Sequence, residues 1–287
     1  MSVEKKINRA REYMKNSPQT KVALAKSLQI ARSSLYYKST KQKNDLVFKP
    51  NIEAVMKDHP AYGHRRVADA LGINKKKALR LMRKFNLKPK IRRKQKQPSK
   101  PDDVNNPATK VVNIAKKTCP LYTNILWSGD FTYLWFAGRF WYLATVIDVY
   151  TREIIGYHIG KHHTTSLIIK ALFNAIHSTN STPTWFHSDQ GSEYVSGTYT
   201  RLLKVHDIIP SHSKKGCPWH NAYQESFYSN FKLELGDIQK HASIGELIEA
   251  IYQQLDYYNK RRIHTSLRMP PITFKETQAK KITTHAV

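Results

Sequence analysis

The chain has 287 residues, with 48 Lys and Arg against 21 Asp and Glu, and its formal net charge of +27 indicates a polyanionic partner such as nucleic acid. Its two cysteines, Cys119 and Cys217, exclude a disulfide framework, and without a C-x-x-C pair they exclude a cysteine zinc finger. No apolar run is long enough to cross a membrane, and residues 1–13 lack the apolar stretch of a secretion signal, so we expect a cytoplasmic protein with no membrane partner.

The basic charge is concentrated at the start of the chain. Residues 1–118 hold 31 basic and 8 acidic residues, whereas residues 119–287 hold 17 and 13. We expect residues 2–15 to be helical, followed by a helix from Gln19 that breaks near Gln29 and a second short helix opening with Arg32 and Ser33. Two short helices joined by a tight turn are typical of the helix-turn-helix, which binds DNA.

A second helical pair follows the sequence Y-G-H-R-R of residues 62–66. Gly72 makes the turn, and Asn74 caps a helix with three lysines in its first turn. The positive charge of these lysines is unfavourable next to the positive end of the helix dipole. This cost is explained if DNA phosphates neutralise the lysines. The alternative is a plain helical hairpin with a basic face. The DNA contacts predicted from both pairs are Arg32, Ser33, Arg65, Arg66, Lys75, Lys76 and Lys77.

The hydrophobic period changes to that of β-strands after a basic linker, residues 91–118. We predict strands over 125–136, 140–150 and 153–159, a helix over 164–178, a strand over 184–187, a helix over 196–205, a strand over 207–212, and helices over 219–235 and 243–258. This order is that of the RNase H-like fold, an α/β fold whose five-stranded mixed sheet has flanking helices. The predicted domains are two helix-turn-helix segments, 1–48 and 49–90, the linker, a core of 119–235 and a helical extension of 236–287.

Two acidic residues lie in or directly after strands that this topology makes neighbours. Asp130 lies inside the first strand, where Asp is depleted, and Asp189 follows the fourth. Glu225, on the helix over 219–235, is placed to come over them. Three carboxylates within ~4 Å would repel by about 4 kcal/mol per pair at an effective dielectric near 20, so they need divalent cations. Two such ions roughly 4 Å apart form the arrangement used for phosphoryl transfer.

The helix over 219–235 carries an aromatic stripe beside a polar line. The stripe consists of Tyr223, Phe227, Tyr228 and Phe231. The polar line holds Asn221, Glu225 and Lys232, of which the last two are seven residues apart and therefore share a face. This line is an active-site candidate, and the alternative is a solvated polar face.

Several short sequence motifs, taken together and in order, resemble those of DDE insertion-sequence transposases with an integrase core, of the IS-three type encoded as OrfB. These motifs are Y-G-H-R-R, W-S-G-D-F-T-Y, A-T-V-I-D-V-Y-T-R-E-I-I-G, H-S-D-Q-G-S-E-Y, K-G-C-P-W-H-N-A-Y-Q-E-S-F and Y-N-K-R-R-I-H-T-S-L. The resemblance implies that Asp130, Asp189 and Glu225 are catalytic and hold two Mg²⁺ ions, for which Mn²⁺ can substitute. It places His187, Gln190, Asn221 and Lys232 in supporting roles. One departure is His220, where members of the family often carry Asp.

The resemblance also implies the reaction and its partners. The protein is expected to bind the terminal inverted repeats of an insertion sequence, release a 3′-hydroxyl and join it to double-stranded target DNA. It is expected to act as a homo-oligomer on DNA in the bacterial cytoplasm at the nucleoid, alone or with an OrfA partner or fusion. Two other functions share some of these features, namely a simple nuclease of the same fold and a DNA-binding regulator without activity.

Besides the three acidic residues Asp130, Asp189 and Glu225, three other residues are expected to contact DNA phosphates. Lys232 lies two turns beyond Glu225, with an intrahelical pair to Glu234 as the alternative. Arg262 and His264 lie in the C-terminal segment, where the alternative is a solvated loop.

Overall fold

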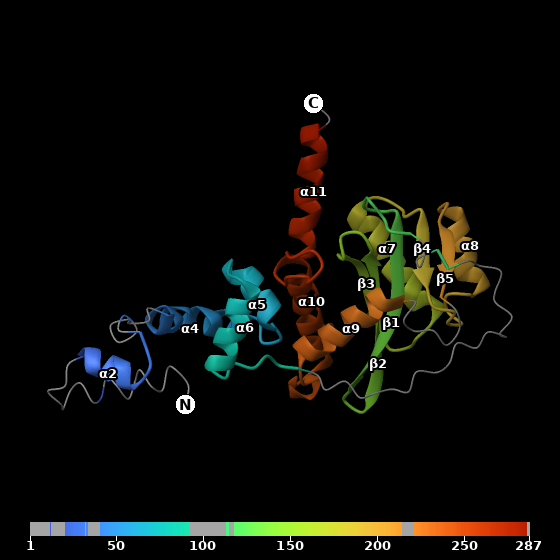
Figure 1. Cartoon of the computed structure of the whole chain (residues 1–287). Helices are drawn as coiled ribbons and strands as arrows, with labels where there is room; N and C mark the ends of the chain where they lie inside the picture. The colour runs from blue at the N-terminus through green and yellow to red at the C-terminus, as the bar shows by residue number, and fades with distance from the viewer. Residues whose placement is uncertain are drawn as a thin grey trace, which may run out of the picture. The chain divides into compact units, whose positions relative to one another are not determined.

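The structure is a computed structural model that describes residues 12, 21–31, 33, 41–91, 113–114, 118–213 and 221–285 (Figure 1). Contacts divide the chain into two units, Met1–Asn51 and Ile52–Val287. In the first unit, helix α2 spans Lys21–Ser27 and is followed by Gln29 with a positive φ of 54°, so the predicted break is found. The helices predicted over 2–15 and from Arg32 onward lie outside the described residues, apart from Glu12 and Ser33.

Helix α4 crosses a predicted domain boundary. It spans Lys41–Asp58 without a break at residues 48 and 49, and it contains Pro50. The division between the two units falls inside the same helix, after Asn51. The sequence between the two predicted helix-turn-helix segments is therefore helical.

The predicted helical pair at the start of the second unit is present. Helix α5, His64–Leu71, ends at Gly72, whose φ of 62° is favoured by glycine. Asn74 then caps helix α6, Lys75–Lys84, by accepting a hydrogen bond from the backbone N–H of Lys76 (2.8 Å). The inward faces bury a small core that consists of Val67, Ala68, Ala78, Leu81 and Met82.

The same unit contains a five-stranded mixed sheet. Its strands are β1 (Leu126–Phe136), β2 (Arg139–Asp148), β3 (Ile154–Gly160), β4 (Trp185–Ser188) and β5 (Ile209–His212), in the order β3-β2-β1-β4-β5. The first three strands pair antiparallel, while β1 pairs parallel with β4, and β4 with β5. The predicted fold is confirmed, including the neighbouring positions of the first and fourth strands.

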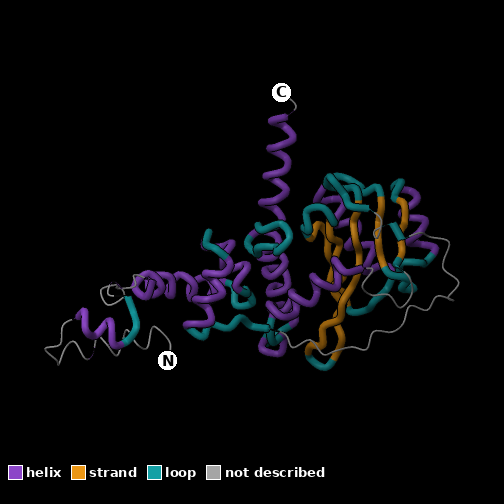
Figure 2. The backbone as a smooth tube through the Cα atoms, in the orientation of Figure 1, coloured by secondary structure: helices purple, strands orange, loops and turns teal. Residues whose placement is uncertain are grey.

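Helices cover both faces of the sheet (Figure 2). Helices α7 (Thr165–Thr179) and α8 (Gly197–Val205) build one core with Trp127, Val146 and Phe186. Helices α9 (Ala222–Leu235) and α10 (Ile244–Lys260) build the other with Leu134, Leu143 and Ile147. Three of the four aromatic residues of the predicted stripe, Phe227, Tyr228 and Phe231, are buried in this second core, because they face the sheet and α10.

The end of α10 and the residues just after it are joined to the segment that precedes α5. The backbone N–H of Ile263 donates to the hydroxyl of Tyr62 (2.6 Å), and the hydroxyl of Tyr257 bonds to Nδ1 of His59 (2.6 Å). A last helix, α11, spans Pro271–His285 within the predicted helical extension. Residues of the second predicted segment and of the extension therefore pack together in one unit.

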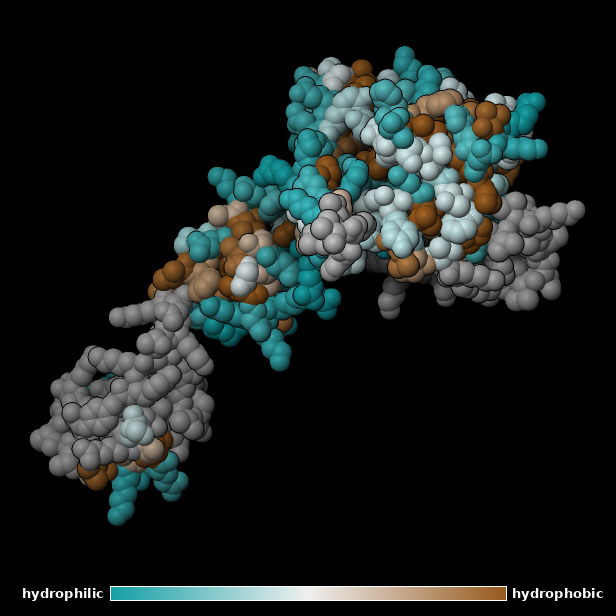
Figure 3. Space-filling model, turned by 90° about the horizontal axis from the view of Figure 1, so that it is seen from above, coloured by the Kyte–Doolittle hydropathy of each residue, from teal (hydrophilic) through white to brown (hydrophobic). Residues whose placement is uncertain are grey.

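The surface drawn in Figure 3 is largely hydrophilic, with small hydrophobic patches scattered between the polar side chains. Among the described helices, none combines the length and the apolar character that a membrane crossing requires.

Candidate active site

Asp130 is a partly buried carboxylate in the middle of the sheet. It pairs across the strands with Thr145 on β2, and its Oδ1 accepts a hydrogen bond from the N–H of Phe131 (2.8 Å). Burial, and to a lesser extent the negative charge of Asp189, raise the pKa of Asp130 to about 7. The two predicted aspartates therefore lie close enough to repel one another.

Gly129, the residue before Asp130, permits the close approach of β1 to its neighbour. A Cβ atom at this position would lie 2.4 Å from Cζ of Phe186 on β4 and 3.4 Å from the hydroxyl of Tyr194. Phe186 is buried in the core, so it has no free space to move into. Glycine is thus required for β1 and β4 to bring their acidic residues to the same place.

Asp189 follows β4 and is exposed. Its Oδ1 accepts a hydrogen bond from the N–H of Gly191 (3.0 Å), which fixes the carboxylate at the start of the loop. Gly191 does not have a positive φ, so the backbone conformation is not what requires glycine here. A Cβ at Gly191 would instead lie 3.0 Å from Oδ1 of Asp189 and 3.2 Å from Oε2 of Glu193. Glycine leaves room between these two carboxylates.

Helix α9 is fixed to β1 by polar contacts to Asp130 itself and to the residues just before it. Asn221 accepts from the hydroxyl of Ser128 (2.6 Å) and donates to the carbonyl of Gly129 (3.3 Å). Tyr228 donates to the carbonyl of Asp130 itself (2.8 Å). These bonds hold the helix in register with the strand that carries the aspartate.

Gln224 completes this contact and was not predicted as a site residue. Its side chain has 0% exposure, and its Nε2 donates to the carbonyls of Ser128 (2.6 Å) and Thr145 (3.1 Å). Its Oε1 accepts from the hydroxyl of Thr145 (2.9 Å). The signal in the sequence is the spacing of Asn221, Gln224 and Tyr228 by three and four residues, which places polar groups on the face that packs on the sheet.

Glu225 lies on α9 between Asn221 and Tyr228, which contact β1 at and just before Asp130. It is four residues after Asn221 and three before Tyr228, so it lies beside the contact face, and its side chain is exposed. In the part of the chain that the structure describes, no three His, Cys, Asp or Glu side chains are grouped closely enough to hold a metal ion. The structure therefore brings Asp130 and Asp189 together and leaves Glu225 exposed on the neighbouring helix.

The predicted supporting residues hold neighbouring segments in place. His187 is buried, and its Nδ1 bonds to the hydroxyl of Ser211 (2.9 Å). Gln190 donates to the carbonyl of Ser213 (2.9 Å). The ammonium of Lys232 lies 4.8 Å from the centre of the Tyr133 ring. Glu234, its proposed intrahelical partner, is bound by Arg262 and Gln254.

Glu193 and His163 form a second unpredicted feature beside the aspartates. Oε1 of Glu193 lies 2.7 Å from Nδ1 of His163, whose ring stacks on Phe131. Burial acts to raise the pKa of Glu193, but hydrogen bonds that include those from His163 and Ser192 outweigh it and lower the pKa. The pair involves residues 30 positions apart, and no spacing in the sequence indicates it.

The predicted DNA contacts have different surroundings. Arg65, Lys76 and Ser33 are exposed, Arg66, Lys75 and Lys77 are half-buried, and Arg32 lies outside the described residues. Arg262 is only 2% exposed, and its Nε lies 2.7 Å from Oε1 of Glu234. Arg262 is buried because it pairs with Glu234, a carboxylate far from it in the sequence. It is therefore neither the side chain of a solvated loop nor a freely exposed phosphate contact. His264 is partly buried, and burial together with Arg152, Arg262 and Arg66 lowers its pKa to about 4.

Comparisons with known proteins agree with this architecture. Two models described as integrase core domain match residues 122–218 and 206–271. The InsK protein of insertion sequence element IS150 from Escherichia coli K12 is 32% identical over 265 residues, 88% of this chain and 92% of that protein. The transposase of IS904 from Lactococcus lactis is 31% identical, over 77% of this chain and 90% of its own length.

A solved structure shows the same fold. The simian T-cell lymphotropic virus intasome in complex with a PP2A regulatory subunit aligns with a TM-score of 0.50 and 16% identity, over 78% of this chain and 73% of that chain. The chain matches the integrase core domain and is similar over most of its length to insertion-sequence transposases. It therefore belongs to the IS-three family of insertion-sequence transposases, enzymes of DNA transposition and integration.

Proposed function

We propose that this transposase cleaves and joins DNA at a site formed by Asp130, Asp189 and Glu225 with two divalent cations. The observation that carries the proposal is the partly buried Asp130 beside Asp189, at the point where parallel strands β1 and β4 adjoin. Such a pair is costly without a cation, and carboxylate oxygens are the ligands that Mg²⁺ prefers.

The residues of the chain divide the work at this site. Asp130 and Asp189 would hold the cations from the sheet, and Glu225 would complete the site from α9. When bound, two Mg²⁺ ions activate the attacking oxygen and stabilise the leaving oxygen of an in-line phosphoryl transfer. Asn221, Gln224 and Tyr228 hold α9 against β1, and Glu225, exposed on the same helix, would turn toward the aspartates when the cations bind.

Lys232 and the helical pair would bind the substrate. The ammonium of Lys232, on the same face of α9 as Glu225, would contact a phosphate next to the scissile bond. The exposed Arg65 and Lys76 and the half-buried Arg66, Lys75 and Lys77 would contact the backbone of the terminal repeats.

The partners follow from the reaction. Joining two element ends to a target requires double-stranded DNA of both kinds, so we propose a homo-oligomer on DNA, with an OrfA protein as a partner or fused segment. Cleavage and joining would take place at the nucleoid in the bacterial cytoplasm, where the DNA lies.

A strand-transfer assay tests the proposal. Purified full-length protein should join a labelled element-end duplex to a plasmid with Mg²⁺ or Mn²⁺ and should be inert in chelator. Asp130→Asn, Asp189→Asn and Glu225→Gln should each abolish joining while retaining DNA binding. The control is Asp256→Asn, the same chemical change at an exposed carboxylate that pairs with Lys260.

The other two functions give different products. A simple nuclease would cut the duplex without joining it, and a regulator would bind it without cutting. Full joining activity in any one of the three acidic variants would remove that residue from the proposed site.

A further inference from the structure

A cavity of about 260 Å³ lies beside α9, away from the two aspartates. It is below the ~300–1,000 Å³ that drug-sized ligands fill, so it suits a small group. Side chains from three parts of the chain line it: the β2–β3 turn, α9, and the end of α10 with the segment after it. The polar ones are Arg152, Tyr223, Ser226, Asn230, Tyr258, Arg262, His264 and Ser266.

Both arginines have buried donors without a protein acceptor. Nε and Nη1 of Arg152 and Nη2 of Arg262 find no hydrogen-bond partner among the described residues. Buried donors are nearly always paired in proteins, and each one left unpaired costs about 1–3 kcal/mol. Arg262 uses its Nε for Glu234, which leaves Nη2 for another acceptor. Both side chains line the cavity, which therefore offers room for an acceptor that comes from outside the chain.

The charge around the cavity is strongly positive. The guanidinium of Arg152 stacks on Tyr223, with Cζ 4.1 Å from the ring centre. Next to these groups, the pKa of His264 is lowered to about 4 by burial and by Arg152, Arg262 and Arg66, so its ring is neutral at pH 7. The charge of the lining at that pH therefore comes from the arginines, and it favours an anion.

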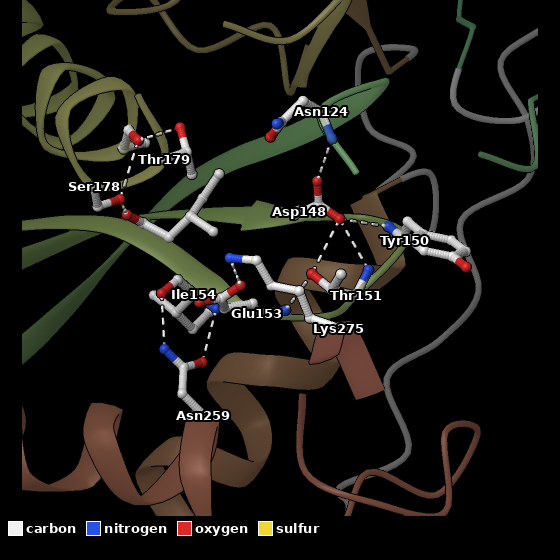
Figure 4. A network of polar contacts seen from close by, with 12 residues as sticks. Asn124, Asp148, Tyr150, Thr151, Glu153, Ile154, Ser178, Thr179, Asn259 and Lys275 are labelled. Atoms are coloured by element: carbon white, nitrogen blue, oxygen red, sulfur yellow. Dashed lines mark hydrogen bonds and ion pairs between the residues drawn. The ribbon is translucent and has the colours of Figure 1, made fainter. Parts of the chain in front are cut away.

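A polar network around Asp148 and Asn259 holds the turn between β2 and β3 in place (Figure 4). Asp148 accepts hydrogen bonds from the N–H groups of Tyr150 (3.0 Å) and Thr151 (2.9 Å), and its own carbonyl accepts from the N–H of Arg152 (2.8 Å). Asn259 on α10 bonds to both the N–H and the carbonyl of Ile154 (2.9 Å each). The turn that carries Arg152 is thus tied to the helix that precedes Arg262.

We propose that this cavity, the Arg152–Arg262 pocket, binds a phosphate group. Guanidinium groups present paired N–H donors that match phosphate oxygens, and the free donors of both arginines supply that geometry. The phosphate comes either from a DNA strand or from a free phosphate or nucleotide. DNA is favoured because Tyr223 and Ser226 flank Glu225 on α9, an argument that rests on the proposed function.

Binding measured in chelator tests the pocket without any chemistry, so a failure of the catalytic proposal does not affect the result. Full-length protein with ¹³C-labelled histidine is titrated with inorganic phosphate and, separately, with an element-end duplex, and the His264 signal is assigned with His264→Gln. A phosphate in the pocket should raise the pKa of His264, because it offsets the nearby positive charge. Anisotropy over a range of salt concentrations gives the DNA affinity.

Arg152→Gln should weaken DNA binding about tenfold and lower the slope of log affinity against log salt by about one. Arg201→Gln on α8, which removes the same charge from an exposed side chain, should leave the slope unchanged. Ser226→Asp, an exposed position on α9, should exclude an anion without disturbing the core if Arg152→Gln fails to fold.

Each combination of results decides the proposal. A response to the duplex that both pocket variants lose assigns a DNA phosphate. A response to inorganic phosphate alone assigns a free phosphate or nucleotide. If neither probe moves the His264 signal and the salt slope of the variants equals that of the wild type, the pocket binds no phosphate.

Discussion

Replacing Asp130 by Asn should stabilise the protein in the absence of metal while abolishing its activity. The pKa of Asp130 is raised from 3.8 to about 7, a difference of about three units, and each unit corresponds to about 1.4 kcal/mol. The upper limit is therefore about 4 kcal/mol, and because the carboxylate keeps some contact with water we expect about 2 kcal/mol. Asn retains the oxygen that accepts from the N–H of Phe131.

The sign of the effect depends on pH. Since the pKa is higher in the folded state, the protonated form of Asp130 is favoured by folding. Its contribution to stability is complete below pH 4 and is lost as the pH rises through about 7. The gain from Asp130→Asn should thus be large at pH 8 and small at pH 4.

Urea unfolding in chelator at pH 4 and pH 8 measures this difference. Adding Mg²⁺ at pH 8 should stabilise the wild type and leave Asp130→Asn unchanged, whereas Asp256→Asn should follow the wild type throughout. If Asp130→Asn were less stable than the wild type at pH 8, or if the difference in stability did not depend on pH, the pKa of Asp130 would not be raised in the folded protein.

Three further changes test the surroundings of the site. Gly129→Ala should lower stability by about 1–3 kcal/mol in a urea titration, because its Cβ would overlap the buried Phe186 ring; an unchanged midpoint would contradict the close approach of the strands. Gln224→Leu should cost about 2–4 kcal/mol and slow joining, since it removes the side-chain donor from two buried carbonyls, and wild-type rates would show that α9 does not depend on this contact. Lys232→Ala should reduce end joining at unchanged melting temperature, and wild-type joining would remove Lys232 from the DNA-binding face.

The strands and helices of the catalytic core were predictable because their signals are local. Aromatic and β-branched residues mark the strands on either side of Ala137 and Gly138, and both residues of the turn have the positive φ that such a turn requires. The neighbouring positions of Asp130 and Asp189 followed from the order of the strands. The spacing of residues along one element thus determined much of the fold.

The contacts that support the site were not predictable, because they join residues far apart in the sequence. Gln224 and Thr145 are 79 positions apart, and neither is unusual for its own helix or strand. Arg262 lies in a run of charges typical of a solvated loop, yet it is buried by Glu234, 28 positions away. Tyr62 and Ile263 are 201 positions apart, and their contact joins two segments that composition alone divides into separate domains.

The central claim is that three carboxylates hold the cations, and the position of Mn²⁺ in crystals of the full-length protein bound to an element-end duplex tests it most directly. Anomalous scattering should reveal two ions roughly 4 Å apart beside Asp130 and Asp189, with the Glu225 side chain turned inward as a ligand. Ions bound elsewhere, or an exposed Glu225 with both ions in place, would contradict the account.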